Sequence, residues 1–275
     1  MMAPRWIVAA AFASASLAAA AQSQHTEGGS DSELAQKLTN PVAAMISVPF
    51  QFNYDDNIGP ADDGHKTYVN IQPVIPHQLN DEWNVITRVI LPVVDQSDIF
   101  PGAGSQSGLG DITASLFFSP IKPTDGGLIW AIGPVFYIPT ATDDLLGGKK
   151  WGLGPTGLVL KQSHGWTYGA LVNHIWSVAS VRGNDDHPDI SATYLQPFLS
   201  YTTKTAWTYG SNFEATYDWK ASQWAVPLNL SIGKLVRFGK TPVSFTGGAG
   251  YWLEHSDTGA KGFRYRFVVT VLFPT

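Results

Sequence analysis

The chain has 275 residues, of which only 14% are charged, with 22 Asp and Glu against 17 Lys and Arg and no cysteine. Soluble domains have about 25% charged residues, and here Gly, Pro and a 12% aromatic fraction make up the difference. This composition excludes a disordered chain, a disulfide scaffold and a thiolate metal site. The net charge of −5 does not favour a nucleic-acid partner. Beyond the N-terminus no stretch of about 18 apolar residues suggests a spanning helix. We therefore expect an aromatic-rich β protein.

The first 21 residues predict a cleaved signal peptide. Arg5 precedes a stretch from Ile7 to Ala21 that is wholly apolar or small, and an A-x-A pattern leads into Gln22. Such a stretch is short for a spanning helix, and the flank after Ala21 is weakly polar, so an uncleaved anchor is the less favoured alternative. Residues 22–40 then read as a polar periplasmic tether, with one or two helical turns from Glu33 to Leu38.

From Asn40 onward the side chains alternate with a period of two. Near the end of the chain, Phe263, Tyr265 and Phe267 alternate with Arg264 and Arg266. This alternation places the two sets on opposite faces of a strand. About twelve such runs lie between turn signals: 41–54, 67–79, 82–94, 109–120, 127–139, 151–163, 165–179, 189–202, 206–218, 223–237, 241–254 and 262–274.

The connections between these runs alternate in length. The first is long and polar (DDNIGPADDGHK), whereas the second is a short turn around Asn80-Asp81. The same alternation continues along the chain, with the segment IKPTDGG as an exception. Long loops at one end and tight turns at the other are typical of bacterial outer-membrane barrels. The sequence therefore predicts an all-β fold, an antiparallel up-and-down transmembrane β-barrel of about twelve strands over residues 41–275, with both termini periplasmic.

The placement of charge supports a lipid-facing surface. Most acidic residues lie in the long connections, and the strands are nearly free of charge. A Lys or Arg at mid-bilayer costs about 2–4 kcal/mol, so a lipid-facing wall is apolar. Tryptophan favours the headgroup level, and seven lie near predicted strand ends: Trp83, Trp166, Trp176, Trp207, Trp219, Trp224 and Trp252. These features disfavour a soluble, carbohydrate-binding sandwich.

The run from Asn40 to Tyr54 (NPVAAMISVPFQFNY), followed by Asn57-Ile58-Gly59-Pro60, carries a family resemblance. It resembles the opening strand of bacterial outer-membrane proteins linked to the meta-pathway of phenol degradation, often labelled "transporter" or "neuromedin U". Similar pieces recur up to Leu272-Phe273-Pro274, so the resemblance covers residues 40–275. It implies an outer-membrane barrel that handles aromatic or other hydrophobic compounds. Phe273 would then be the signal for the outer-membrane assembly machinery.

The polar parity of the strands predicts which side chains line the lumen. The candidates are Ser47, Gln51, Asn53, Gln72, Arg88, Gln196, Asn212, Glu214, Asn229, Arg264 and Arg266. Charges deep inside their strands must face water or an opposite charge, because unpaired burial is prohibitive. Two hypotheses stay open: a polar constriction that screens solutes, and a fixed Arg–Glu network that plugs the lumen.

Catalytic and metal-binding motifs are weak in this sequence. It contains no GxSxG elbow and no HExxH pair, the signatures of acyl transfer and of zinc hydrolysis. Barrel hydrolases pair Ser and His on neighbouring strands; the nearest candidates, His174 and Ser177, have opposite parity. The groups Asp62-Asp63 and Asp185-Asp186-His187 could bind a divalent cation through carboxylate oxygens, but they read more readily as solvated loop residues. We therefore expect neither an enzyme nor a cofactor.

These observations predict an outer-membrane channel or transporter for small, aromatic or hydrophobic compounds. Its partners would be outer-membrane lipids, the assembly machinery and a small-molecule solute, and no nucleic acid. The alternative is a non-conducting outer-membrane barrel with a structural or surface-binding role.

Overall fold

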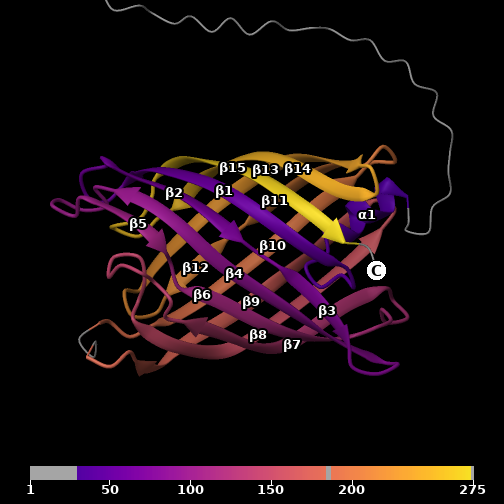
Figure 1. Cartoon of the computed structure of the whole chain (residues 1–275), viewed down its shortest axis with the longest axis horizontal. Coiled ribbons are helices and arrows are strands. Elements are labelled where there is room, and N and C mark those ends of the chain that lie inside the picture. The colour runs from indigo at the N-terminus through magenta and orange to yellow at the C-terminus, as the bar shows by residue number, and fades with distance from the viewer. Residues whose placement is uncertain (1–29, 184–186, 274–275) are drawn as a thin grey trace, which may run out of the picture.

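The computed structural model describes residues 30–183 and 187–273, and its strands close into an antiparallel barrel (Figure 1). A short helix, α1 (Asp31–Leu38), precedes them. The strand segments are β1 (Ile46–Ile58), β2 (Gly64–Ile71), β3 (Val74–Gln78), β4 (Trp83–Ser97), β5 (Ser105–Leu109), β6 (Ile112–Pro120), β7 (Leu128–Ile138), β8 (Lys150–Ser163), β9 (Trp166–Ser180), β10 (Ser191–Thr202), β11 (Trp207–Phe213), β12 (Ala215–Asp218), β13 (Gln223–Phe238), β14 (Thr241–Glu254) and β15 (Gly262–Phe273).

These fifteen segments form the twelve strands of the barrel because three strands are interrupted, between β2 and β3, β5 and β6, and β11 and β12. The break after β2 contains Pro73, which has no N–H to donate to a neighbouring strand. At the last break, the Glu214 N–H donates to the Pro227 carbonyl at 3.2 Å. The predicted twelve-stranded antiparallel barrel is confirmed.

The barrel closes where its last strand pairs with its first. β15 lies antiparallel to β1 in a continuous register from Ile46 opposite Phe273 to Asp55 opposite Arg264. Every strand thus has two neighbours, so no sheet edge is left with unpaired backbone groups. This pairing also places Asn53 and Asp55 of the first strand beside Arg266 and Arg264 of the last.

Period-two alternation determines which side chains face outward. On β1, Phe52 is exposed and Asn53 is 2% exposed, whereas on β15 Tyr265 is exposed and Arg264 is 3% exposed. The outer surface is therefore aromatic and aliphatic, and the charged side chains of these strands point inward. A one-residue slip in register would reverse this arrangement.

Exposed tryptophans gather near both ends of the strands. Trp166 lies at the start of β9 and Trp176 lies ten residues later, near its end. With a rise of about 3.4 Å per residue and a tilt of about 40°, they are separated by roughly 26 Å along the barrel axis, close to the ~25 Å height of an apolar band. Trp252 departs from the prediction, because it points into the barrel and its Nε1 donates to Asp55 Oδ1 at 3.0 Å.

The connections at one end are mostly shorter than those at the other, as the sequence predicts, with 121–127 as a long turn and 219–222 as a short loop. One end of the barrel has the turns 79–82, 121–127, 164–165, 203–206 and 239–240, and the other has the loops 59–63, 98–104, 139–149, 181–190, 219–222 and 255–261. The turn between β8 and β9 needs left-handed backbone at both positions, with φ of 50° at His164 and 85° at Gly165. This is the two-residue turn that matches the twist of a β-hairpin.

The chain before the barrel is more ordered than a polar tether. Ser30 caps α1: its hydroxyl accepts from the Glu33 N–H, and the Glu33 carboxylate accepts from the Ser30 N–H. Such a capping box satisfies two backbone donors at a helix start. β1 begins at Ile46 instead of residue 41. Residues 1–29, which include the predicted signal peptide, lie outside the described part of the chain.

α1 lies at the short-turn end of the barrel, the same end as the C-terminus (Figure 1). Its eight residues are too few to span a bilayer. Among the described residues there is no helix with the length and apolar character needed to cross a membrane.

Candidate functional site

The polar side chains predicted for the lumen come from inward-facing strand positions and from two of the strand breaks, which contain Gln72 and Glu214. Ser47, Gln51, Gln72 and Arg88 border a space at the short-turn end. The remaining seven lie further along the inner wall, where they line cavities or hydrogen-bond to one another: Asn53, Gln196, Asn212, Glu214, Asn229, Arg264 and Arg266.

An ionic network crosses the inside of the barrel. Arg266 contacts the Glu214 carboxylate at two points, with Nη1–Oε1 at 2.6 Å and Nη2–Oε2 at 2.9 Å. Arg264 bonds to the same carboxylate at 3.3 Å and to Asp55 Oδ2 at 3.0 Å, and it also donates to the Tyr68 hydroxyl. Because buried charges are tolerated only when they are paired and hydrogen-bonded, this network allows the charges to sit inside the barrel.

A line of amides continues the network toward the short-turn end. Arg266 Nε donates to Asn53 Oδ1 at 2.8 Å, and Gln51 Nε2 donates to the same oxygen at 3.2 Å. Gln51 Oε1 accepts from Gln72 Nε2 at 3.3 Å. Gln72 Oε1 in turn accepts from Arg88 Nη2 at 3.0 Å. These hydrogen bonds therefore connect the ion pair of Arg266 and Glu214 to Arg88.

Arg88 differs from the other two arginines in its partners. Its side chain bonds to the neutral amide of Gln72, and among the described residues no carboxylate lies within ion-pair distance of it. The sequence grouped Arg88 with Arg264 and Arg266 by parity alone. The structure instead separates a paired group from a cation whose charge is not matched by a contacting carboxylate.

Two glycines of β14 make room for the ionic network. Gly248 pairs with Arg266 and Gly250 pairs with Arg264 in the register of β14 and β15. A Cβ at Gly250 would lie 2.5 Å from Asn229 Oδ1 and 2.9 Å from Arg264 Cγ. Separations below about 3.0 Å are not adopted by real Cβ atoms. The arginines can therefore cross β14 toward Glu214 because these positions carry no side chain.

The central part of the lumen is a cavity of about 620 Å³. Its wall combines the guanidinium groups of Arg88 and Arg266 and the Glu214 carboxylate with aromatic rings, amides and aliphatic side chains. The aromatic members are Tyr68, Phe117, Tyr137 and Tyr194; the amides are Gln51, Asn70, Gln72, Asn173 and Gln196. Such a mixture can contact both an apolar ring and a polar substituent of one small molecule.

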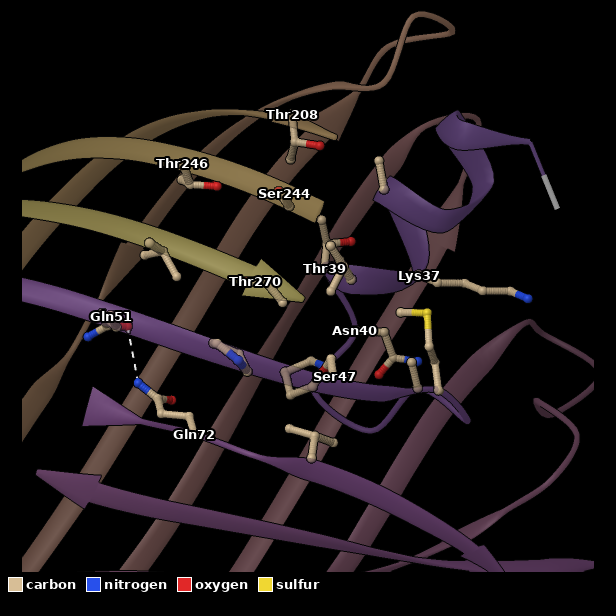
Figure 2. Close-up of a pocket in the computed structure, with 18 of the residues that line it drawn as sticks. Lys37, Thr39, Asn40, Ser47, Gln51, Gln72, Thr208, Ser244, Thr246 and Thr270 are labelled. Carbon is tan, nitrogen blue, oxygen red and sulfur yellow. Dashed lines mark hydrogen bonds between the residues drawn. The ribbon is translucent and has the colours of Figure 1, made fainter. Parts of the chain in front are cut away.

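A second cavity of about 280 Å³ lies at the short-turn end. Figure 2 shows Gln51 and Gln72 joined by a hydrogen bond at one side of it, with Lys37 of α1 extending away from it. Gln51, Gln72 and Arg88 border this cavity and the central one alike. These three side chains therefore form the partition between the two spaces.

α1 and the residues that follow it are packed into the short-turn mouth. Leu34, Ala35 and Met45 are buried against Leu235 and Leu272 of the barrel wall and against Ala206 of the turn 203–206. Val42 is buried in a second apolar cluster, whose wall residues are Ile86, Phe117, Ala131, Leu158, Leu160 and Leu171. Burial of a Leu or Val side chain stabilises by roughly 1.5–3 kcal/mol, so these contacts hold the N-terminal segment in the mouth.

Polar contacts fix the orientation of this segment. Arg237 pairs with Asp31 at 2.5 Å. Thr39 Oγ1 donates to Thr167 Oγ1 at 2.6 Å, and Gln162 Nε2 donates to the Gln36 carbonyl at 2.7 Å. Sequence reasoning missed this arrangement. The signal available was the pattern of apolar residues at positions 34, 35, 38 and 42 before the first strand.

The long-loop end is narrowed by the loop 139–149. Asp111 accepts from the N–H of Ala141 at 2.9 Å and from that of Gly148 at 2.7 Å. Gln96 Nε2 donates to the Leu145 carbonyl at 3.1 Å. These bonds tie the loop to inward-facing side chains of the barrel, and Gly148 lines the central cavity.

The described part of the chain contains no cluster of metal-ligating side chains. Over residues 30–183 and 187–273, no three His, Asp or Glu side chains come together as a candidate cation site. Asp62 pairs with Lys261. Asp185 and Asp186, the other acidic pair named from the sequence, lie outside the described residues.

No family model matches this chain, and no curated protein matches it. Its fold is similar to that of solved outer-membrane proteins. The COG4313 outer membrane channel from Pseudomonas putida F1 superposes with a TM-score of 0.64 at 15% identity, covering 83% of this chain and 94% of that one. The NanC porin gives a TM-score of 0.50 at 8% identity, covering 84% and 100%. These similarities show an outer-membrane barrel fold.

The similar structures also include outer membrane phospholipase A from Escherichia coli, with a TM-score of 0.45 at 11% identity over 82% of this chain and 89% of that one. That protein is an enzyme. The expectation that this chain is not an enzyme rests on missing sequence motifs alone, and the proteins that are similar to it in fold include an enzyme.

Proposed function

We propose that this protein is an outer-membrane channel that lets small aromatic or otherwise hydrophobic compounds cross. The observation that carries the proposal is the central cavity of about 620 Å³ inside the barrel. Pockets of about 300–1,000 Å³ suit small ligands. The resemblance to barrels linked to phenol degradation supports an aromatic solute, and the similarity in fold to an outer membrane channel supports passage across the membrane.

The chemistry of the cavity favours a solute that carries both a ring and a polar group. Tyr68, Tyr137 and Tyr194 contribute aromatic rings to its wall, which pack well against other rings. The neighbouring amides offer hydrogen bonds without requiring the solute to be charged. A phenol or an aromatic carboxylate therefore fits this wall better than a sugar or an aliphatic chain does.

Arg88 biases the channel toward anionic solutes. Its guanidinium lies on the partition between the two cavities, so a solute that moves from one to the other passes this charge. Two unit charges about 4 Å apart interact by about 4 kcal/mol at an effective dielectric constant of 20. An aromatic carboxylate should consequently pass faster than a neutral aromatic compound of the same size.

The decisive experiment measures passage through the purified barrel in planar bilayers and in liposomes. Benzoate and benzyl alcohol serve as matched solutes with and without a negative charge. The native protein should conduct, and Arg88→Gln should reduce benzoate entry severalfold while benzyl alcohol entry changes little. Lys204→Gln is the control, because Lys204 is an exposed cation in the turn 203–206, outside the lumen.

The rival function, a non-conducting barrel, is favoured by one observation. α1 and residues 39–45 occupy the short-turn mouth and bury apolar side chains there. If native protein and a variant with a displaced α1 both fail to conduct or to admit either solute, the channel proposal is wrong. Conductance that appears only when α1 is displaced would identify α1 as the gate of the channel.

A further inference from the structure

A serine, a histidine and a threonine form a hydrogen-bonded group on the outer face of the barrel. His174 lies on β9, and its register partner on β10 is Thr193, whereas Ser191 pairs with Trp176. Ser191 Oγ lies 3.4 Å from His174 Nε2. Thr193 Oγ1 lies 2.7 Å from His174 Nδ1. The two ring nitrogens of one imidazole thus contact two hydroxyls from the neighbouring strand.

A fourth residue orients the threonine. Trp219 Nε1 is 2.8 Å from Thr193 Oγ1, and an indole nitrogen can only donate. One lone pair of the threonine oxygen is therefore used, and the other is available to the Nδ1–H of His174. With the proton on Nδ1, the lone pair of Nε2 points toward Ser191. This is the tautomer in which a histidine accepts a proton from a serine.

The group lies at the depth of lipid ester bonds. Ser191 is level with Trp176 in the register of β9 and β10, and Trp176 belongs to the exposed tryptophans near the long-loop end. Such tryptophans mark the headgroup level. A cavity of about 280 Å³ opens beside Ser191, between Trp176 and Trp219, and Lys220 also lines it. The cavity therefore faces the boundary between headgroups and acyl chains.

We propose that Ser191 and His174 form a catalytic pair that hydrolyses the acyl ester of a lipid in the outer leaflet, with Thr193 as the positioning residue. The Ser–His distance is slightly long for a hydrogen bond, as is common before a substrate binds. This activity is separate from the proposed channel, because none of the three side chains faces the lumen.

The chemistry needs water as its second substrate. Ser191 Oγ attacks the ester carbonyl carbon while His174 Nε2 takes the serine proton. The bond between that carbon and the alkoxy oxygen then breaks, and the leaving alcohol receives the proton from His174. Water attacks the resulting acyl-serine ester, His174 takes one of its protons and returns it to Ser191, and the fatty acid leaves. The cavity is lined by one cation, Lys220, and one carboxylate, Asp189; of the two, Lys220 is the group that can stabilise the negative charge that develops on the carbonyl oxygen.

Ser177, the partner that sequence proximity suggests for His174, cannot take this role. Its hydroxyl donates to Asp189 Oδ1 at 3.1 Å and accepts from the Ile190 N–H at 3.1 Å. Its parity on β9 is opposite to that of His174. Strand pairing, which brings residue 191 beside residue 174, identifies the better nucleophile.

The test uses the full protein in detergent micelles with an alkyl fluorophosphonate, which reacts covalently with activated serines. The native protein should be labelled on Ser191, as located by mass spectrometry, and should release fatty acid from a diacyl glycerophospholipid in mixed micelles. Ser191→Ala and His174→Gln should lower both rates by about 10³-fold or more. Ser105→Ala is the matched control and should keep both rates, because Ser105 is an exposed serine on β5 that does not line this cavity.

Thr193 provides a test of positioning. Thr193→Val removes the hydroxyl and should slow labelling, while Thr193→Ser, which keeps it, should restore the rate. Each variant is first checked for the shift on boiling that marks a folded barrel. Absence of labelling and of lipid hydrolysis in folded native protein would overturn the proposal, as would undiminished rates in Ser191→Ala or His174→Gln.

Discussion

Arg266 and Glu214 form a two-point ion pair that bridges the inside of the barrel above β13 and β14. The two N–O distances are 2.6 and 2.9 Å. Glu214 lies at the break between β11 and β12, whereas Arg266 lies on β15. The pair therefore links β15 to the strand formed by β11 and β12, although β13 and β14 lie between them.

The first prediction concerns this pair. In Arg266→Ala the Glu214 carboxylate keeps Arg264 at 3.3 Å, so we expect the barrel to assemble. One positive charge is lost from a poorly screened space, where a charge about 4 Å away is worth about 4 kcal/mol. The ratio of anion to cation permeability should fall severalfold, as measured by the reversal potential in a KCl gradient. Lys204→Ala is the control for a charge outside the lumen and should keep the native selectivity. If Arg266→Ala also kept the native selectivity, Arg266 would be excluded from the pathway.

A second prediction tests the space beside Arg264. Gly250→Ala places a methyl group 2.5 Å from Asn229 Oδ1, and overpacking of this kind costs about 1–3 kcal/mol. We expect its barrel to lose heat resistance, measured as the temperature at which it shifts on a gel. Gly247→Ala is a matched control on the same strand, because a Cβ there has no atom within 4 Å. If both variants shifted at the same temperature, the absence of a side chain at Gly250 would not be needed to accommodate the ionic network.

Alternation and loop lengths made most of the fold predictable. Phe52 and Asn53 differ in side-chain class, and this local difference is enough to assign the two faces of β1. The count of twelve strands followed because each connection carries its own turn signals. Trp252 was misassigned because its position near a strand end suggested the headgroup level, whereas its indole pairs with Asp55 from a distant part of the chain.

The site was less predictable than the fold because its contacts are not local. Parity alone placed Arg88 and Arg266 on the same face, but whether each has a carboxylate partner depends on how far the Glu214 side chain reaches across β13 and β14. Ser191 and His174 are 17 residues apart, and only the register of β9 and β10 brings them together. For α1, the short sequence is compatible with a free tether, and burial against Leu235 and Leu272 decides otherwise.

The orientation of the barrel leads to a third prediction. A tag inserted after Gly183, in the loop 181–190, should be reached by antibody on intact cells, because long loops face outward in outer-membrane barrels. A tag at Gly239 should not be reached, since the turn 239–240 lies at the opposite end. Permeabilised cells show that both tags are present. Labelling of Gly239 alone on intact cells would reverse the orientation.

The fourth prediction concerns the seat of α1. Leu34 is 3% exposed and packs against Ala206, Leu235 and Leu272. Leu34→Asp would bury an unpaired carboxylate there, at a cost of several kcal/mol. We therefore expect α1 to leave the mouth, and the mean single-channel conductance in planar bilayers to rise. Glu33→Gln is the control, because residue 33 is exposed and the amide oxygen still accepts from the Ser30 N–H. A folded Leu34→Asp barrel with native conductance would show that α1 does not limit passage.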